Sequence, residues 1–187
     1  MYCNPYNHYQ WHIPMHDNRN IRNWSNYWNP HYYNWNNCNY CIPYMEYNKL
    51  TDYGLRPLVV NIDRATKQNN TYRTALWTGK HFQVTLMSID VGDDIGLEVH
   101  PTTDQFIRIE EGQGLVQMGD SKEILDYQEM ACEDFAIIIP AGKWHNVTNT
   151  GNTPLKVYVI YAPPEHPYGT VHETKADAMS KKENNNY

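Results

Sequence analysis

Several common features are missing from this 187-residue sequence. No run of apolar residues approaches the ~20 residues that a membrane-spanning helix needs, so we expect no membrane partner. Fifteen basic side chains against 21 acidic ones give a formal net charge of −6. A nucleic-acid surface needs a basic patch, so we expect no nucleic-acid partner. The first residues contain neither a basic segment nor an apolar one, and we predict no secretion signal.

Cysteine is also scarce. Four cysteines are too few for a disulfide scaffold in a chain of this length. Cys38 and Cys41 have Cys-x-x-Cys spacing, but the second pair that a zinc knuckle needs is missing. Pro43 argues against the helix that follows such a pair in a redox site. We therefore interpret these two cysteines as incidental or as cross-linking residues.

Aliphatic residues are nearly absent from residues 1–46, where asparagine, tyrosine, tryptophan and histidine dominate. Such a segment cannot build a conventional core, and polar-aromatic tracts are typically disordered alone and prone to associate with each other. We divide the chain into a low-complexity tail at 1–46, a globular domain at 47–178 and a polar tail at 179–187. The first tail is either an inert flexible segment or an arm that attaches the domain to an assembly.

The globular part consists of short apolar segments separated by glycine, proline and asparagine. We expect a loop or short helical turn at 63–70, and strands at residues 58–62, 74–78, 82–89, 104–111, 115–118, 124–127, 136–139 and 155–161. Between residues 82 and 87 the apolar residues alternate with others, which predicts a half-buried strand. Short strands at nearly regular spacing predict an all-β sandwich or barrel.

The end of the globular part has a helix signal. Thr174 and Asp177 have the spacing of a capping box, and alanines follow, so we predict a short helix at 174–182. The proline-rich segment before it carries His166 and His172. We expect these two histidines on the surface rather than over the mouth of a barrel.

Two segments combine strand patterns with residues that bind metals. Glu98 and His100 are separated by one residue, so on a strand both side chains point to the same side. Gln105 follows in the next strand-like run, where its neighbour Asp104 would face the opposite way. His145 lies just after a Pro-x-Gly turn, at the start of another strand. We expect the two segments to bring these groups into one concave space.

The spacing of these residues resembles the paired motifs of the cupin superfamily. The residues on the first motif are Gly92, Glu98, His100, Gln105 and Gly112. The residues on the second, with aspartate where glycine is usual at its start, are Asp134, Pro140, Gly142, His145 and Asn149. The resemblance covers about residues 47–178 and is closest to small, single-domain bacterial cupins. It implies a cupin-type jelly-roll β-barrel, also called a double-stranded β-helix.

The resemblance also implies a metal site made by Glu98, His100, Gln105 and His145. Two imidazoles and a carboxylate suit a divalent ion such as zinc, manganese, iron, nickel or cobalt. Cupins usually have a histidine where Glu98 stands and a glutamate where Gln105 stands. The neutral amide of Gln105 is a poorer donor, so we expect its bond to be weak or absent. The alternative is a cupin that has lost its metal and keeps these residues as hydrogen-bonding groups.

Cupins that look like this one include sugar-phosphate isomerases and dioxygenases, so the resemblance implies a small-molecule ligand inside the barrel. In an isomerase, Glu98 would be the catalytic carboxylate that moves a proton, and Lys143 would hold a phosphate. Two other classes stay open, namely a binding module without turnover and a structural coat protein. The tail resembles those of spore-coat proteins of Gram-positive bacteria in composition. It implies coat or assembly partners for a cytoplasmic or spore-associated protein, with a homodimer as a further candidate assembly.

Overall fold

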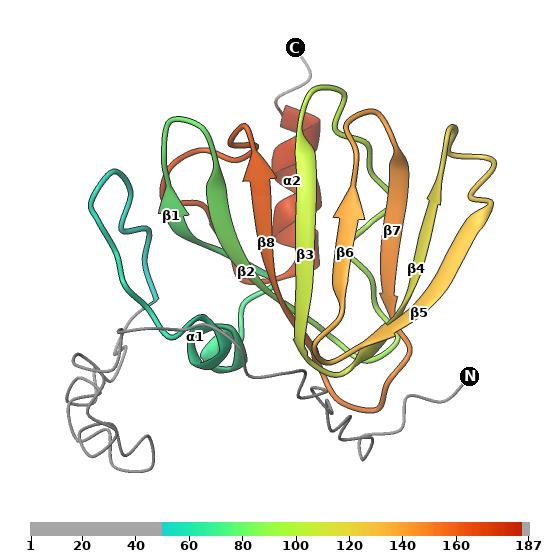
Figure 1. Cartoon of the computed structure of the whole chain (residues 1–187), viewed down its shortest axis with the longest axis horizontal. Helices are drawn as coiled ribbons and strands as arrows, with labels where there is room; N and C mark the ends of the chain where they lie inside the picture. Colours follow the sequence, from blue (N-terminus) through green and yellow to red (C-terminus); the bar gives the residue numbers. More distant parts are fainter. Residues whose placement is uncertain (1–49, 185–187) are drawn as a thin grey trace, which may run out of the picture. The chain divides into compact units, whose positions relative to one another are not determined.

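The computed structural model describes residues 50–184, so the predictions for the N-terminal tail and for Cys38 and Cys41 lie outside the described residues. Two antiparallel β-sheets pack face to face in this range (Figure 1). The core between them takes Ile107 from one sheet and Val147 from the other. The helices of this part of the chain are α1 (Ile62–Gln68) and α2 (Lys175–Asn184).

The larger sheet has six strands in the order β6-β3-β8-β2-β1-β9, and Figure 1 shows it from β1 at the left to β6. In that order the strands are Ala136–Ile139, Asp104–Glu111, Leu155–Ala162, Gln83–Ile89, Arg73–Thr78 and Val171–His172. The register sets Gln83 opposite Tyr161, and Tyr161 opposite Gln105. Residues directly opposite each other face the same side of a sheet, so this row of polar side chains points into the barrel.

The smaller sheet has three strands in the order β5-β4-β7, which are Tyr127–Cys132, Gln113–Gly119 and Trp144–Asn149. The two sheets form the predicted all-β jelly-roll barrel, and the short C-terminal helix is present as α2. The strand predicted at 104–111 coincides with β3. Five further predicted strands agree with the structure to within two residues at each end, namely 74–78, 82–89, 115–118, 136–139 and 155–161.

The strand predicted at 58–62 is wrong. The segment is not paired in a sheet, and the chain instead enters α1 after Asn61, whose side-chain oxygen accepts a hydrogen bond from the backbone N–H of Arg64 (3.0 Å). An asparagine in this position is a favourable helix N-cap. The apolar residues of this segment have another role, because Leu58 and Val60 pack against an outer cluster that includes Ala65 of α1.

The strand predicted at 124–127 is also misplaced. Ser121 and Ile124 form an isolated bridge that closes a turn, and β5 begins only at Tyr127. The prediction that β2 is half-buried is wrong for a different reason. Leu86 on its outer face packs with Ala65 of α1 and is fully buried, while the inward-facing residues of the strand are buried in the barrel. Both faces of β2 are therefore covered.

The C-terminal part confirms the capping box. The backbone N–H of Thr174 donates to Asp177 (2.9 Å), and the N–H of Asp177 donates back to the Thr174 hydroxyl (3.2 Å). The surface position expected for His172 is wrong, because β9 pairs with β1 and leaves this side chain only 7% exposed. His166 is half-buried, with its ring edge-on to that of Tyr161. Neither helix in the described range is long and apolar enough to cross a membrane.

Candidate metal centre

Backbone hydrogen bonds join the two segments singled out in the sequence. The N–H of Glu98 donates to the carbonyl of His145 (3.0 Å), and the N–H of His145 donates to the carbonyl of Glu98 (2.9 Å). The N–H of Gly142 donates to the carbonyl of His100 (2.8 Å). These bonds hold the segment that carries Glu98 and His100 against the start of β7. The backbone therefore fixes where the side chains of Glu98, His100 and His145 begin.

Left-handed backbone shapes the second segment at two positions. Gly142 has φ +81°, as expected for a glycine in such a turn. Asp134, which stands where the cupin motif usually has glycine, has φ +72°. Aspartate is one of the few other residues that tolerate this region, and its carboxylate pairs with the guanidinium of Arg108 (2.5 Å). The departure from the motif therefore keeps the backbone conformation that the motif needs.

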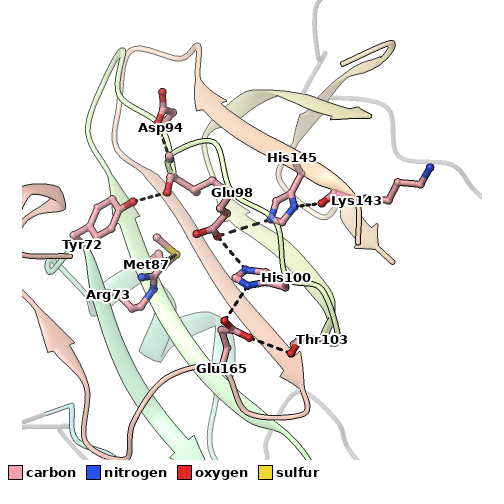
Figure 2. A network of polar contacts seen from close by, with 12 residues as sticks. Tyr72, Arg73, Met87, Asp94, Glu98, His100, Thr103, Lys143, His145 and Glu165 are labelled. Atoms are coloured by element: carbon pink, nitrogen blue, oxygen red, sulfur yellow. Dashed lines mark hydrogen bonds and ion pairs between the residues drawn. The ribbon is translucent and has the colours of Figure 1, made fainter. Parts of the chain in front are cut away.

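Glu98, His100 and His145 form one buried cluster, in which one candidate ligand atom of each residue lies within 4.8 Å of the others. In Figure 2 dashed lines join the Glu98 carboxylate to both imidazoles. Its Oε1 lies 3.3 Å from Nε2 of His100 and 3.8 Å from Nε2 of His145. All three residues are at most 5% exposed. The structure thus brings together three of the four predicted metal ligands through donor atoms suited to a divalent ion.

The ring of His145 is oriented by the backbone. Its Nδ1 lies 2.9 Å from the carbonyl oxygen of Lys143. A carbonyl oxygen can only accept a hydrogen bond, so Nδ1 carries the hydrogen and the neutral ring has its lone pair on Nε2. This Nε2 atom is buried and has no hydrogen-bond partner within the described part of the chain. The lone pair therefore points toward the Glu98 carboxylate.

The ring of His100 is oriented by a residue outside both motifs. Its Nδ1 lies 3.1 Å from Oε1 of Glu165, and Glu165 is held in turn by the Thr103 hydroxyl (3.0 Å). Burial lowers the pKa of His100, but hydrogen bonds to Glu165 and Glu98 outweigh it and raise this pKa to about 9. The His100 hydrogen bond correspondingly lowers the pKa of Glu165. A carboxylate behind a histidine in this way is the arrangement that fixes metal-binding imidazoles in many proteins.

Gln105, the fourth predicted ligand, also lies inside the barrel. Its side chain is 3% exposed, and Oε1 has no hydrogen-bond partner among the described residues. Its neighbour Asp104 is exposed and accepts a hydrogen bond from the N–H of Ala141 (2.9 Å), so it faces outward as expected. Gln105 thus places a buried oxygen in the barrel interior, whereas Asp104 contributes to the turn.

These residues fit a divalent metal ion by their own chemistry. The cluster offers two imidazole nitrogens and one carboxylate oxygen, the donors that zinc and the neighbouring transition metals take. Both rings are hydrogen-bonded at Nδ1, which leaves Nε2 of each toward the same point. The unpartnered Nε2 of His145 and Oε1 of Gln105 are acceptors that a cation would satisfy.

Two residues beside the cluster had no signal in the sequence. Glu165 lies after β8 in the proline-rich segment, and Arg73 projects from β1 into the barrel, where it is 2% exposed. Neither belongs to a local pattern, and only the tertiary fold brings them to the cluster (Figure 2). By contrast, Lys143 does not point to the cluster, because its ammonium pairs with exposed Asp120.

Comparison with known proteins gives the family. A family model described as a cupin domain matches residues 85–161, a range that contains both motifs. The protein YrkC of Bacillus subtilis (strain 168) is 70% identical over 131 residues, which is 70% of this chain and 70% of that protein. The chain is a cupin.

Two further proteins resemble this cupin. L612 of Acanthamoeba polyphaga mimivirus is 42% identical over 114 residues, which is 60% of the chain and 69% of the viral protein. The crystal structure of BH2720 from Bacillus halodurans is 67% identical in sequence and has a TM-score of 0.69. That match covers 70% of this chain and 98% of the Bacillus halodurans protein. The shared region is therefore a nearly complete protein in that relative.

Proposed function

We propose that this cupin binds one divalent transition metal ion through Glu98, His100 and His145, and that it holds a small oxygen-bearing molecule beside the ion inside the barrel. Gln105 is assigned as a weaker fourth donor. When bound, the metal supplies Lewis-acid polarisation of an oxygen atom of that molecule. The metal is one of zinc, manganese, iron, nickel or cobalt, because these ions accept mixed nitrogen and oxygen donors.

One contact carries this proposal. The Glu98 carboxylate and the lone pair of Nε2 of His145 face each other at 3.8 Å in the buried interior. When the His145 ring is neutral, both groups are electron-rich acceptors that repel each other, and they are stable side by side only if a positive centre lies close to both. Without metal that centre is the protonated ring of His100, and a bound metal ion would take its place. Electrostatic interactions are stronger in a buried site than in water. A metal ion bound by Glu98, His100 and His145 turns this repulsion into attraction.

The positions of the ligands also decide between two roles for Glu98. Its Oε1 is the oxygen closest to both imidazoles, which supports a ligand role over that of a carboxylate shuttling protons to a substrate. The catalytic role predicted from the sequence stays a prediction. The neutral amide of Gln105 contributes less binding energy than an imidazole, because it has no charge and water can take its place.

Metal content measured on purified protein tests the proposal. The protein is freed of metal with a chelator, dialysed against each metal alone and examined by elemental analysis, with wild type expected to retain about one equivalent. His100→Ala and His145→Ala each remove a nitrogen donor and should abolish retention, whereas Gln105→Ala should lower affinity less. His81→Ala is the matched control, because His81 is exposed on the turn between β1 and β2.

The ordering of the variants is what decides the result. Equal metal content in wild type, His100→Ala and His145→Ala would remove the site. Loss of metal from Gln105→Ala as complete as that from His100→Ala would overturn the assignment of Gln105 as the weaker donor. Binding that His81→Ala also abolishes would mean that the ion sits elsewhere on the protein.

A further inference from the structure

The barrel interior contains one positively charged side chain that the metal site does not use. Arg73 on β1 is 2% exposed and lies on the inner face, where its guanidinium contacts the sulfur of Met87 (Nη2 to Sδ, 3.9 Å). Its Cζ also lies 5.5 Å from the centre of the Tyr72 ring. Figure 2 shows Arg73 on the same side of the barrel as Glu98 and His100. A full positive charge is therefore buried next to the candidate metal ligands.

The contacts of Arg73 do not satisfy this charge. A guanidinium has five N–H donors, but a thioether sulfur is a weak acceptor, and the Nε of Arg73 has no hydrogen-bond partner among the described residues. Glu98 and Tyr161 stabilise the guanidinium electrostatically, and the Tyr161 hydroxyl lies close enough to interact with it directly. Buried charges normally have a partner, because an unpaired one costs several kcal/mol.

Two hydroxyl groups around Arg73 are in the same situation. Thr85 on β2 and Tyr161 on β8 are fully buried, and the Thr85 hydroxyl has no hydrogen-bond partner in the described part of the chain, while the Tyr161 hydroxyl lies beside the guanidinium of Arg73 without a well-aligned hydrogen bond. Thr85 lies opposite Ala75, two residues along β1 from Arg73. The Tyr161 ring stands edge-on to the His100 imidazole, with 5.6 Å between ring centres. Polar groups with unused hydrogen-bonding capacity thus extend from Arg73 to the edge of the metal cluster.

We propose that Arg73, with the hydroxyls of Thr85 and Tyr161, binds the carboxylate group of a small organic acid whose other oxygen atoms face Glu98, His100 and His145. This inference rests on the proposed function for the position of the rest of the ligand, but the carboxylate site itself consists only of protein groups. The planar fork of a guanidinium matches the two oxygens of a carboxylate.

A carboxylate fits this site better than a phosphate. One arginine supplies a single positive charge, and the other cations of the neighbouring strands point away from the interior: Lys156 bonds to the carbonyl of Asn69, and Arg108 pairs with Asp134. A monoanion balances that charge, whereas a phosphate dianion would need a second cation. Glu165 and His166 lie against His100 and Tyr161, on the side of the cluster where the segment after β8 passes.

The first test follows binding in the wild-type protein and uses a variant only to assign one signal. Pyruvate is titrated into metal-free and into zinc-loaded protein, and the Nε–H signals of the arginines are followed by ¹⁵N-edited NMR. We expect pyruvate to shift one buried arginine signal, assigned to Arg73 by its absence from Arg73→Lys. Hydroxyacetone, a neutral molecule of the same carbon number, should leave that signal in place. A signal that responds equally to both molecules, or to neither, would overturn the proposal.

Calorimetric titration of variants gives the size of the effect. Arg73→Gln should weaken pyruvate binding by about 30-fold or more, because the buried carboxylate loses its charged partner, whereas Arg73→Lys keeps the charge and should lose less. Arg56→Gln is the matched control, since Arg56 is exposed outside the barrel, and should bind within about twofold of wild type. Unchanged affinity in Arg73→Gln would overturn the proposal.

Two further outcomes separate this inference from the metal proposal. Inorganic phosphate that binds more tightly than pyruvate and displaces it would overturn the carboxylate assignment. If zinc and the other metals fail to bind, the proposed function fails, but a pyruvate-dependent shift of the Arg73 signal in metal-free protein would still support the carboxylate site. Conversely, one equivalent of bound metal with no response of Arg73 would support the metal centre and remove the carboxylate site.

Discussion

The same strands build a dry end and a polar end of one barrel. At one end the inward-facing residues of β2, β8 and β3 are apolar, with Ile89 opposite Leu155 and Val157 opposite Ile109. A few residues further along the same strands, the row becomes Gln83, Tyr161 and Gln105. Both ends are buried to a similar degree. Burial therefore does not distinguish the candidate site from the core, but the chemistry of the buried atoms does.

The two ends are held together by different forces. Ile109 and Leu155 contribute through apolar area removed from water, at about 25 cal/mol per Å². Groups at the polar end gain little from that source and are held by specific bonds, such as those from Thr103 to Glu165 and from Gly142 to His100. We infer that the dry end provides most of the stability and the polar end provides the chemistry. Substitutions should separate the two contributions.

The largest expected effect on stability is at the dry end. Ile109→Ala removes three carbon atoms from a fully buried site and should lower the free energy of unfolding by about 2–5 kcal/mol. The matched substitution at the polar end, Gln105→Ala, should cost about 1 kcal/mol or less, because it also removes an oxygen without a hydrogen bond. Urea unfolding of both metal-free variants measures this difference. A larger loss in Gln105→Ala would contradict the division between the two ends.

Gly142→Val should have a smaller effect on stability and a larger one on the site. The backbone there has φ +81°, which a β-branched residue strongly disfavours, while an added Cβ would meet nothing within 4 Å. The expected cost is therefore conformational, on the order of 1–3 kcal/mol. Metal retention should fall as well, because the Gly142 N–H fixes the backbone of His100.

Gly142→Asn is the control for that experiment, because asparagine tolerates the left-handed region. It should lie much closer to wild type in thermal melting and in metal content. A valine variant with the melting temperature and metal content of wild type would show that this turn can adopt another conformation without disturbing the site.

The sequence was sufficient to predict the parts of the site that are local. Glu98 and His100 lie on one side because they are two residues apart, and His145 follows a turn whose proline and glycine are visible in the sequence. Glu165 and Arg73 are different, because they reach the cluster only through strand order, β1 beside β2 and the chain end beyond β8. No local periodicity encodes which strands become neighbours.

The errors in the fold prediction have the same origin. The short apolar run at 58–62 resembles a strand, but such a run shows only that some of its side chains are covered. Whether a strand partner lies beside the segment depends on the rest of the chain. The left-handed Asp134 shows the converse case. There the side chain departs from the motif, but the backbone conformation is kept.

A smaller effect is expected where α2 is attached to the loop before Glu98. Lys175 pairs with Asp93 and Asp94, at 2.6 Å each. Burial raises the pKa of Asp94, but the hydrogen bond from Lys175 and other bonds outweigh it and hold this pKa below its ordinary value of 3.8. A carboxyl whose pKa is depressed on folding adds stability above its unfolded pKa and loses it as the pH falls through the folded one.

Lys175→Met should therefore lower the free energy of unfolding by about 1 kcal/mol or less at neutral pH, because the groups are partly exposed to solvent. The difference between variant and wild type should stay constant from pH 7 to about pH 5 and shrink below 3.8, where Asp94 becomes protonated. Urea unfolding at a series of pH values measures it. A difference that persists unchanged in acid would mean that the lysine acts through packing of its aliphatic chain.

The smallest effect on the barrel is expected from removal of residues 1–46. Ordering a residue costs roughly 1–2 kcal/mol, and burial of aliphatic side chains is the usual compensation, yet this segment has almost none to bury. A truncated protein that begins near residue 47 should keep the melting temperature and metal content of the full chain. Its association should change instead, because stacking of tyrosine and tryptophan and pairing of asparagine become favourable between chains.

Thermal melting and light scattering on the full chain and the truncated protein, over a range of concentrations, give the two measurements needed. The full chain should scatter more as its concentration rises, and the truncated protein should not. A melting temperature many degrees lower after truncation would show that these residues stabilise the barrel. Equal scattering by the two proteins would leave the N-terminal tail without a role in assembly, and any dimer common to both would then have to form through the barrel.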